Sequence, residues 1–175
     1  DDDDGDGDDD DDEEEDEDGD GGGDGGWWRV DGGWGWWQDG SSDPFMSAYV
    51  VWGLSLSREA GVAFDGAISK RGSAYLASTL VDYENQLDLQ SWMLHALHVS
   101  GVEALNEKQT KAVHVAWENL WLRRDALNAY SRSLLALSAH HAGKADAAMT
   151  LVRNLENGVI RTAASTPSRL QPGTL

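Results

Sequence analysis

Four histidines are the residues of this sequence best suited by type to metal chemistry. His95 and His98 stand three residues apart, and His140 and His141 are adjacent. A zinc site needs further ligands that converge on such a pair, and no His-Glu-x-x-His spacing supplies them. The 175-residue chain has no cysteine, which excludes cysteine-ligated zinc, disulfides and a thiol nucleophile within it. We therefore predict histidines at a core edge or on the surface, and no metal site.

Acidic residues near the N-terminal end offer a second metal-binding pattern. Asp16, Asp18 and Asp20, followed by Gly21, match the first half of a calcium-binding loop. Such a loop needs a bidentate Glu eleven residues after its first ligand, and that position is Trp27. A solvated acidic segment accounts for this run better than a calcium site does.

Catalytic patterns are equally incomplete. Asp82 and Glu84 are close in sequence but fall in a connection, where we expect solvated charges. No Gly-x-Ser-x-Gly elbow marks a nucleophilic serine, and the N-terminal glycines follow no strand that could form a phosphate-binding loop. We predict no catalytic residue and no cofactor, so the chain is expected not to be an enzyme.

The segment from Lys70 to Leu76 carries half of a known motif. Its basic residue, glycine and aromatic-leucine pair resemble the opening half of the repeat in squalene and terpene cyclases. The second half, Gln-x3-Gly-x-Trp, does not follow. Shared hairpin geometry explains the half-motif better than shared chemistry. Protein prenyltransferases share the α/α toroid fold of these cyclases, but they need a zinc-bound cysteine, and this chain has no cysteine.

The net charge of −19 is concentrated at one end of the chain. Residues 1–26 contain 18 of the 32 acidic residues and no Lys or Arg, which leaves 14 acidic and 13 basic residues elsewhere. The body has no basic face for nucleic acid, and no apolar run approaches the roughly 20 residues of a membrane span. Because the leader has nothing apolar to bury, we expect it to be disordered. The chain does not start with Met, so we expect it to derive from a longer protein.

The remaining sequence divides into a loop, a helical region and a tail. Residues 27–42 form a Trp/Gly-rich loop with five tryptophans, which must pack on something. Start and stop signals between 43 and 158 predict six helices: about 44–60, a second capped by Asp65, 86–99, a fourth capped by Asn106, a fifth capped by Asp125 that reaches His141, and 145–157. Residues 159–175 are expected to be irregular. The pattern predicts an all-α fold.

An internal repeat organises these helices into hairpins. A small residue precedes Leu54, Leu97 and Leu137, and these pairs lie 43 and 40 residues apart, which is one helical hairpin per repeat. Small residues allow close approach, so the first, third and fifth helices are expected to form an inner layer and the others an outer layer. Three antiparallel hairpins would leave two apolar ends in need of continuation.

The loop and the first helix also resemble a known family. Residues 31–37, Asp-Gly-Gly-Trp-Gly-Trp-Trp, precede Asp-Pro-Phe-Met-Ser-Ala-Tyr-Val-Val-Trp-Gly-Leu at 43–54. Both resemble bacterial α2-macroglobulin thioester domains. Looser matches continue to about Val159, at 58–61, 71–76, 84–90 and 156–158. The resemblance implies an α/α toroid of the terpenoid cyclase/prenyltransferase type, of which this chain supplies about half.

The same resemblance implies a function. Such proteins trap proteases in the periplasm, cell envelope or extracellular space through an internal thioester, held in a Cys-x-Glu-Gln motif upstream of the loop. That motif is absent here, and residues 36–43 contain no His to accelerate acyl transfer. The chain would be scaffold, with target proteases and other macroglobulin domains as partners, and Trp34, Trp36, Trp37 and Asp39 as a wall beside the thioester. Core packing is the other interpretation of the tryptophans. A terpene-cyclase-like enzyme and a free-standing helical-repeat module are the alternative functions.

Overall fold

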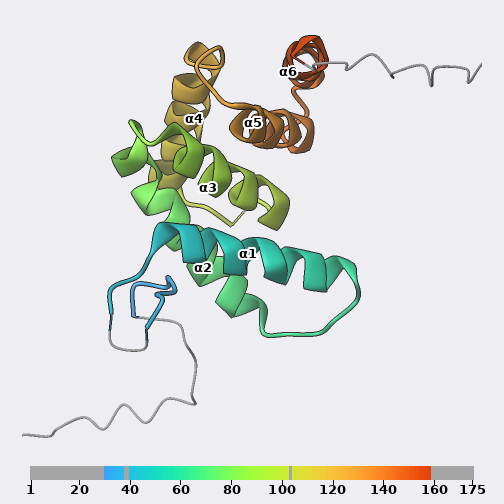
Figure 1. Cartoon of the computed structure of the whole chain (residues 1–175). Helices are drawn as coiled ribbons and strands as arrows, with labels where there is room; N and C mark the ends of the chain where they lie inside the picture. The colour runs from blue at the N-terminus through green and yellow to red at the C-terminus, as the bar shows by residue number, and fades with distance from the viewer. Residues whose placement is uncertain (1–29, 38–39, 103, 159–175) are drawn as a thin grey trace, which may run out of the picture.

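The computed structural model of this chain describes residues 30–37, 40–102 and 104–158, and the elements it describes are helical (Figure 1). The acidic leader, including the run at 16–21 that resembles half a calcium loop, lies outside the described residues, as do Asp39 and the C-terminal tail. No strand occurs among the described residues, so the all-α prediction is confirmed. The elements are α1 (Pro44–Glu59), α2 (Gly66–Thr79), the 3-10 turn η1 (Leu80–Tyr83), α3 (Leu87–Ser100), α4 (Glu107–Leu122), α5 (Ala129–His141) and α6 (Ala145–Asn157).

Most helix ends follow the signals read from the sequence. The Asp43 carboxylate accepts the N–H of Met46 at 2.8 Å and begins α1, with Pro44 at the first helical position. Asn106 and Gln109 form a reciprocal capping box at the start of α4. After α1, α3 and α5 the chain turns through glycines with positive φ, Gly61, Gly101 and Gly143, a conformation that other residues rarely adopt.

The predicted start of the fifth helix is wrong. The cap of α5 is Asn128, whose side chain accepts the N–H of Ser131 at 2.9 Å, and not Asp125. The Arg132 guanidinium donates to the backbone carbonyls of Arg124, Asp125 and Leu127. A helix capped by Asp125 would use the carbonyls of Asp125 and Leu127 internally, so the arginine stabilises the turn before α5 instead.

The helices lie in two layers with one outlier. Helix α3 packs between α1 and α5, and these three helices form one layer. Helices α2 and α4 pack against each other in the second layer. This matches the expected inner and outer layers for the first five helices. Helix α6 packs against α5 but makes no extensive contact with α4 among the described residues. Leu137, expected to face inward, is instead 47% exposed beside α6.

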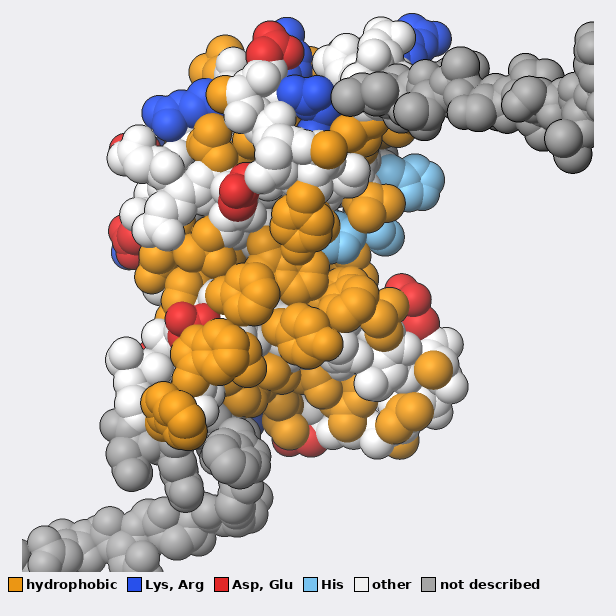
Figure 2. Space-filling model, viewed as in Figure 1, with side chains coloured by type: hydrophobic (Ala, Val, Ile, Leu, Met, Phe, Trp, Pro, Cys, Tyr) orange, Lys and Arg blue, Asp and Glu red, His pale blue; other side chains and the backbone are white. Residues whose placement is uncertain are grey.

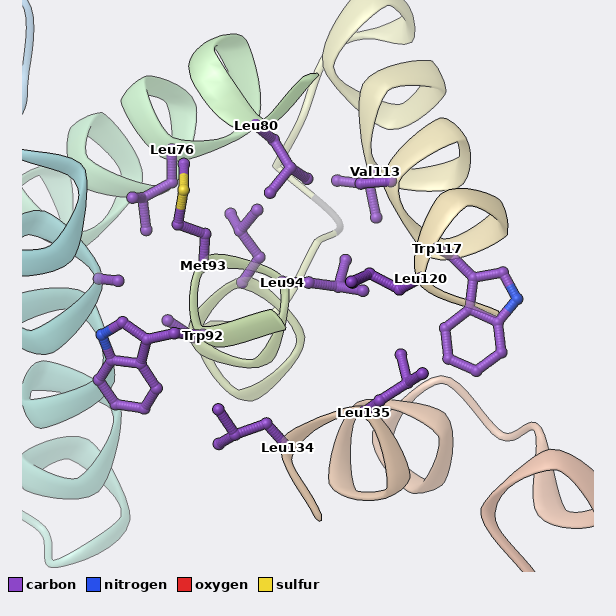
Figure 3. Packing of buried hydrophobic residues seen from close by; sticks show 14 of the residues in the cluster. Leu76, Leu80, Trp92, Met93, Leu94, Val113, Trp117, Leu120, Leu134 and Leu135 are labelled. Atoms are coloured by element: carbon purple, nitrogen blue, oxygen red, sulfur yellow. The ribbon is translucent and has the colours of Figure 1, made fainter. Parts of the chain in front are cut away.

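The core surrounds α3 on most of its circumference. Eight consecutive residues of this helix, 90–97, are buried, and Met93 and Leu94 are fully enclosed. In Figure 3, leucines from the neighbouring helices converge on α3, namely Leu76, Leu80, Leu120, Leu134 and Leu135. Burying a side chain of this size contributes about 1.5–3 kcal/mol, so α3 is the most strongly held helix of the stack.

Candidate functional site

The Trp/Gly-rich loop is tied to α1 through one buried serine. The backbone N–H of Trp34 donates to Oγ of Ser47 at 2.8 Å, and that hydroxyl donates back to the Trp34 carbonyl at 3.2 Å. The backbone N–H of Asp43 also donates to the Trp34 carbonyl, at 2.8 Å. Because Ser47 is fully buried, these bonds form without competition from water, and they fix the loop at the start of α1.

Three glycines allow the loop and the helices to approach closely. Gly32 has φ +87°, and a side-chain carbon there would lie 2.8 Å from the backbone oxygen of Arg71. A side-chain carbon at Gly33 would lie 2.7 Å from Cβ of Ser42. On α2, a carbon at Gly72 would lie 2.5 Å from the indole of Trp34. The Gly-Gly pair and Gly72 are therefore explained by packing.

Polar contacts complete the attachment of the loop. One carboxylate oxygen of Asp31 accepts the N–H of Gly33 at 3.0 Å and the hydroxyl of Ser42 at 2.7 Å. The hydroxyl of Tyr75 on α2 donates to the Ser42 carbonyl at 3.3 Å. Burial raises the pKa of Tyr75 to about 12, with added repulsion from nearby groups that carry negative charge when ionised, Tyr83, Asp31 and Asp43. The loop thus bridges α1 and α2.

The structure separates the tryptophans that were predicted to form a wall beside a thioester. Trp34 is 7% exposed and belongs to the core, as the packing interpretation expects. Trp36 and Trp37 are 59% and 79% exposed on the loop surface. Asp39, the fourth predicted residue, lies outside the described residues. A role of these residues beside a thioester stays a prediction.

An aromatic face that the sequence analysis did not single out lies on the side of α1 and α3 away from the outer layer. We define it as Phe45, Tyr49 and Trp52 on α1 with Trp92 on α3. Trp92 pairs with each of the three α1 rings and Tyr49 pairs with Trp52, at centroid distances of 5.7–6.5 Å, within the range of favourable aromatic pairs. The indole N–H of Trp92 donates to the Phe45 carbonyl at 3.3 Å. Figure 2 shows apolar side chains gathered over this side of the molecule.

Helix α1 is therefore apolar on two faces. Ala48 and Val51 on one face are fully buried in the core, whereas Phe45 and Tyr49 on another are 45% and 54% exposed. The sequence carried the signal, since the three α1 aromatics are spaced four and three residues apart. A helix with apolar side chains on two faces is typical of one that packs against neighbours on both faces. The exposed aromatic face thus resembles a surface that another helix or protein covers.

The histidines continue this face toward α5 but form no metal site. His95 is buried, and its ring lies 6.0 Å from Trp92 and 6.2 Å from His141. Burial, and then repulsion from His141 and His98, lowers the pKa of His95 to about 4. Burial also lowers the pKa of His98, and a hydrogen bond to the Leu94 carbonyl opposes this shift. Among the described residues no group of three or more His, Asp or Glu could hold a metal ion.

The other sequence candidates have structural places. Asp82 and Glu84 are exposed at η1, where solvated connection charges were expected. In the cyclase-like half-motif at 70–76, Gly72 is packed against the loop and Leu76 is buried in the core. This agrees with the interpretation that the half-motif reflects shared hairpin geometry. No helix in the described part of the chain is long and apolar enough to cross a membrane.

Comparison with known proteins gives one relative of limited extent. A stretch of 46 residues is 46% identical to α2-macroglobulin of Thermotoga maritima. The match covers 26% of this chain, and the chain spans only 3% of that protein's length. No protein-family model matches the chain. No solved structure matches it either.

Proposed function

We propose that this chain is part of a bacterial α2-macroglobulin-like protease inhibitor, in which it serves as helical scaffold of the thioester domain. The observation that carries the proposal is the 46% identity over 46 residues with α2-macroglobulin of Thermotoga maritima. The motif residues at 31–37 and 43–54 support the same family. The chain contains no cysteine, so the thioester itself must come from another part of the protein.

The geometry supports a scaffold role for the motif residues. Trp34, Ser47 and Gly72 connect the loop, α1 and α2 through buried contacts. None of these groups is a nucleophile activated by a neighbouring base, as covalent catalysis requires. In the proposed role they hold a rigid corner next to which the reactive segment is placed, and Trp36 and Trp37 on the loop surface would face that segment.

The aromatic face supports membership of a larger assembly. Large exposed apolar patches on a soluble domain mark surfaces that bind another element or protein. In the proposed parent, further helices of the same toroid would cover the face, and neighbouring macroglobulin domains would surround the toroid. Target proteases would meet the complete inhibitor, in the periplasm, the cell envelope or outside the cell.

A second candidate is a terpene-cyclase-like enzyme, and one observation favours it. Aromatic rings such as those of Tyr49, Trp52 and Trp92 can stabilise a carbocation through their negative faces. Such an enzyme also needs an acid that protonates its substrate. The described residues of the aromatic face include no carboxylate, so the scaffold proposal is preferred. A free-standing helical-repeat module is the third candidate.

The gene of the complete protein tests the proposal directly. We expect macroglobulin domains encoded on both sides of this segment, with a Cys-x-Glu-Gln motif upstream. Flanking Gln-x3-Gly-x-Trp repeats would support the cyclase instead. The absence of macroglobulin domains on both sides would refute the proposal.

A dye-binding experiment separates a scaffold segment from a free-standing module. The isolated chain should bind a hydrophobic fluorescent dye and self-associate, because its aromatic face is uncovered. The double substitution Phe45→Ser and Tyr49→Ser should reduce both effects while far-UV circular dichroism keeps its helical signal. Leu122→Ser is the matched control, since Leu122 is exposed on α4 in the outer layer. A monomeric chain that binds no dye would favour the free-standing module.

A further inference from the structure

A small polar pocket lies where the end of α1, the start of α2 and the connection after α3 meet. It has a volume of about 250 Å³, and its polar side chains are Arg58, Lys70, Ser69, Ser73 and Ser100. These are two cations and three hydroxyl groups. No carboxylate occurs among the described residues that line the pocket, so the charged side chains described there are both cations.

The serines leave one hydroxyl unused. Oγ of Ser100 donates to the Leu97 carbonyl at 3.0 Å, so the contact of 3.0 Å between Ser100 and Ser73 uses the hydrogen of Ser73. Ser69 is 6% exposed, yet its hydroxyl, which lines the pocket, bonds to no described residue. This hydroxyl can therefore donate to a ligand in the pocket.

Neither cation at the pocket has a carboxylate partner among the described residues. One guanidinium N–H of Arg58 donates to the Ser100 carbonyl at 2.9 Å, which positions the group and leaves other N–H donors. Lys70 is exposed one residue after Ser69. In the described ranges the single pair at ion-pair distance is His114 with Glu118, so neither cation has a carboxylate partner there.

The first turn of α2 lies at the same pocket and is partly capped by Asp65. The carboxylate and carbonyl oxygens of Asp65 accept the N–H groups of Ala67 and Ile68. The N–H of Gly66, which also lines the pocket, has no partner among the described residues. A side-chain carbon at Gly66 would meet nothing within 4 Å, so there is space at this end of the helix. Helix N-termini attract anions through these unpaired N–H groups and the helix dipole.

We propose that this pocket binds a small oxyanion, held by Arg58, Lys70, the Ser69 hydroxyl and the first turn of α2. The ligand chemistry is that of a phosphate or of a carboxylate on another molecule, because both accept several hydrogen bonds from converging donors. The site lies apart from the aromatic face and does not depend on the proposed function.

Titration of the full chain with anions tests the site. Inorganic phosphate and acetate are added separately at constant ionic strength, with chloride as the reference anion, and backbone amide chemical shifts are recorded. We expect saturable shifts at Gly66, Ser69 and Lys70. Saturation by phosphate alone identifies a tetrahedral anion, and saturation by acetate identifies a carboxylate. The absence of saturation with both anions would overturn the proposal.

Substitutions separate a built site from general charge attraction. Lys70→Gln and Ser69→Ala should each weaken anion binding about tenfold, since each removes a donor to a charged acceptor. Ser69→Ala breaks no hydrogen bond of the described structure, so the helical signal should be unchanged. Lys111→Gln removes an equal charge from exposed α4 and should leave binding unaltered. Equal weakening by Lys111→Gln would show attraction to overall charge and would also overturn the proposal.

Discussion

Replacing either of two helical glycines by alanine should change local stability in opposite directions. Gly53 lies inside α1 and Gly72 inside α2, and both have ordinary helical φ. Alanine is favoured over glycine in a helix interior by about 0.8–1.0 kcal/mol. A methyl group at Gly53 meets nothing within 4 Å, so Gly53→Ala should gain that amount.

The same substitution at Gly72 meets a filled space. The new carbon would lie 2.5 Å from the indole of Trp34 and 2.7 Å from Cγ2 of Val51. Overpacking of this kind costs about 1–3 kcal/mol, which exceeds the gain in helix propensity. We expect Gly72→Ala to destabilise the contact of the loop with α2 by up to about 2 kcal/mol net.

Hydrogen exchange of backbone amides measures both effects, because it reports local opening and needs no two-state transition. Gly72→Ala should speed exchange in α2 by up to about 30-fold, and Gly53→Ala should slow exchange in α1 by about fivefold. Adding Trp34→Leu to Gly72→Ala should remove part of the penalty, since the larger ring is the clashing group. Slower exchange in α2 of Gly72→Ala would refute the packing argument.

Three further outcomes are expected. Ser47→Ala should destabilise the loop by about 1–3 kcal/mol in thermal melts, because the buried N–H of Trp34 loses its acceptor. The control Ser57→Ala removes a partly exposed hydroxyl that bonds within α1, and it should have little effect. His95 has its pKa lowered to about 4 in the folded chain, whereas histidine in an unfolded chain has a pKa of about 6.5, so between these values the unfolded chain binds more protons. The free energy of unfolding should therefore fall between pH 6.5 and pH 4 by up to about 3 kcal/mol. In denaturation curves, His95→Gln should flatten this slope and His114→Gln should not. In an ultraviolet pH titration Tyr75 should ionise near pH 12, a step that Tyr75→Phe removes; ionisation of all four tyrosines near pH 10 would contradict the burial argument.

The helices and their ends were largely predictable from the sequence, because their signals are local. Asp43 with Pro44 and the glycine after α3 act within one turn of the chain, and each has the predicted role. The start of α5 was not predictable in this way. It depends on Arg132, which reaches back to the carbonyls of the preceding turn.

The candidate site was less predictable because its contacts join distant segments. Trp34 and Gly72 are 38 residues apart, and neither residue type shows that the other fills its space. The motif spacing could not tell the buried Trp34 from the exposed Trp36. The aromatic face could have been found from the spacing of Phe45, Tyr49 and Trp52, but its exposure depends on which helices surround α1.

The uneven burial of the helices gives the stack a mechanical polarity. Helix α3 has nine buried residues, whereas α6 has one, Leu151. Tension applied from the C-terminal side would reach α6 first, and its contacts with α5 would break before the core around α3 is loaded. Tension from the N-terminal side would enter at Trp34, which is bonded to α1 and packed on α2, and both helices would have to yield together. The chain should therefore give way stepwise from one side and abruptly from the other.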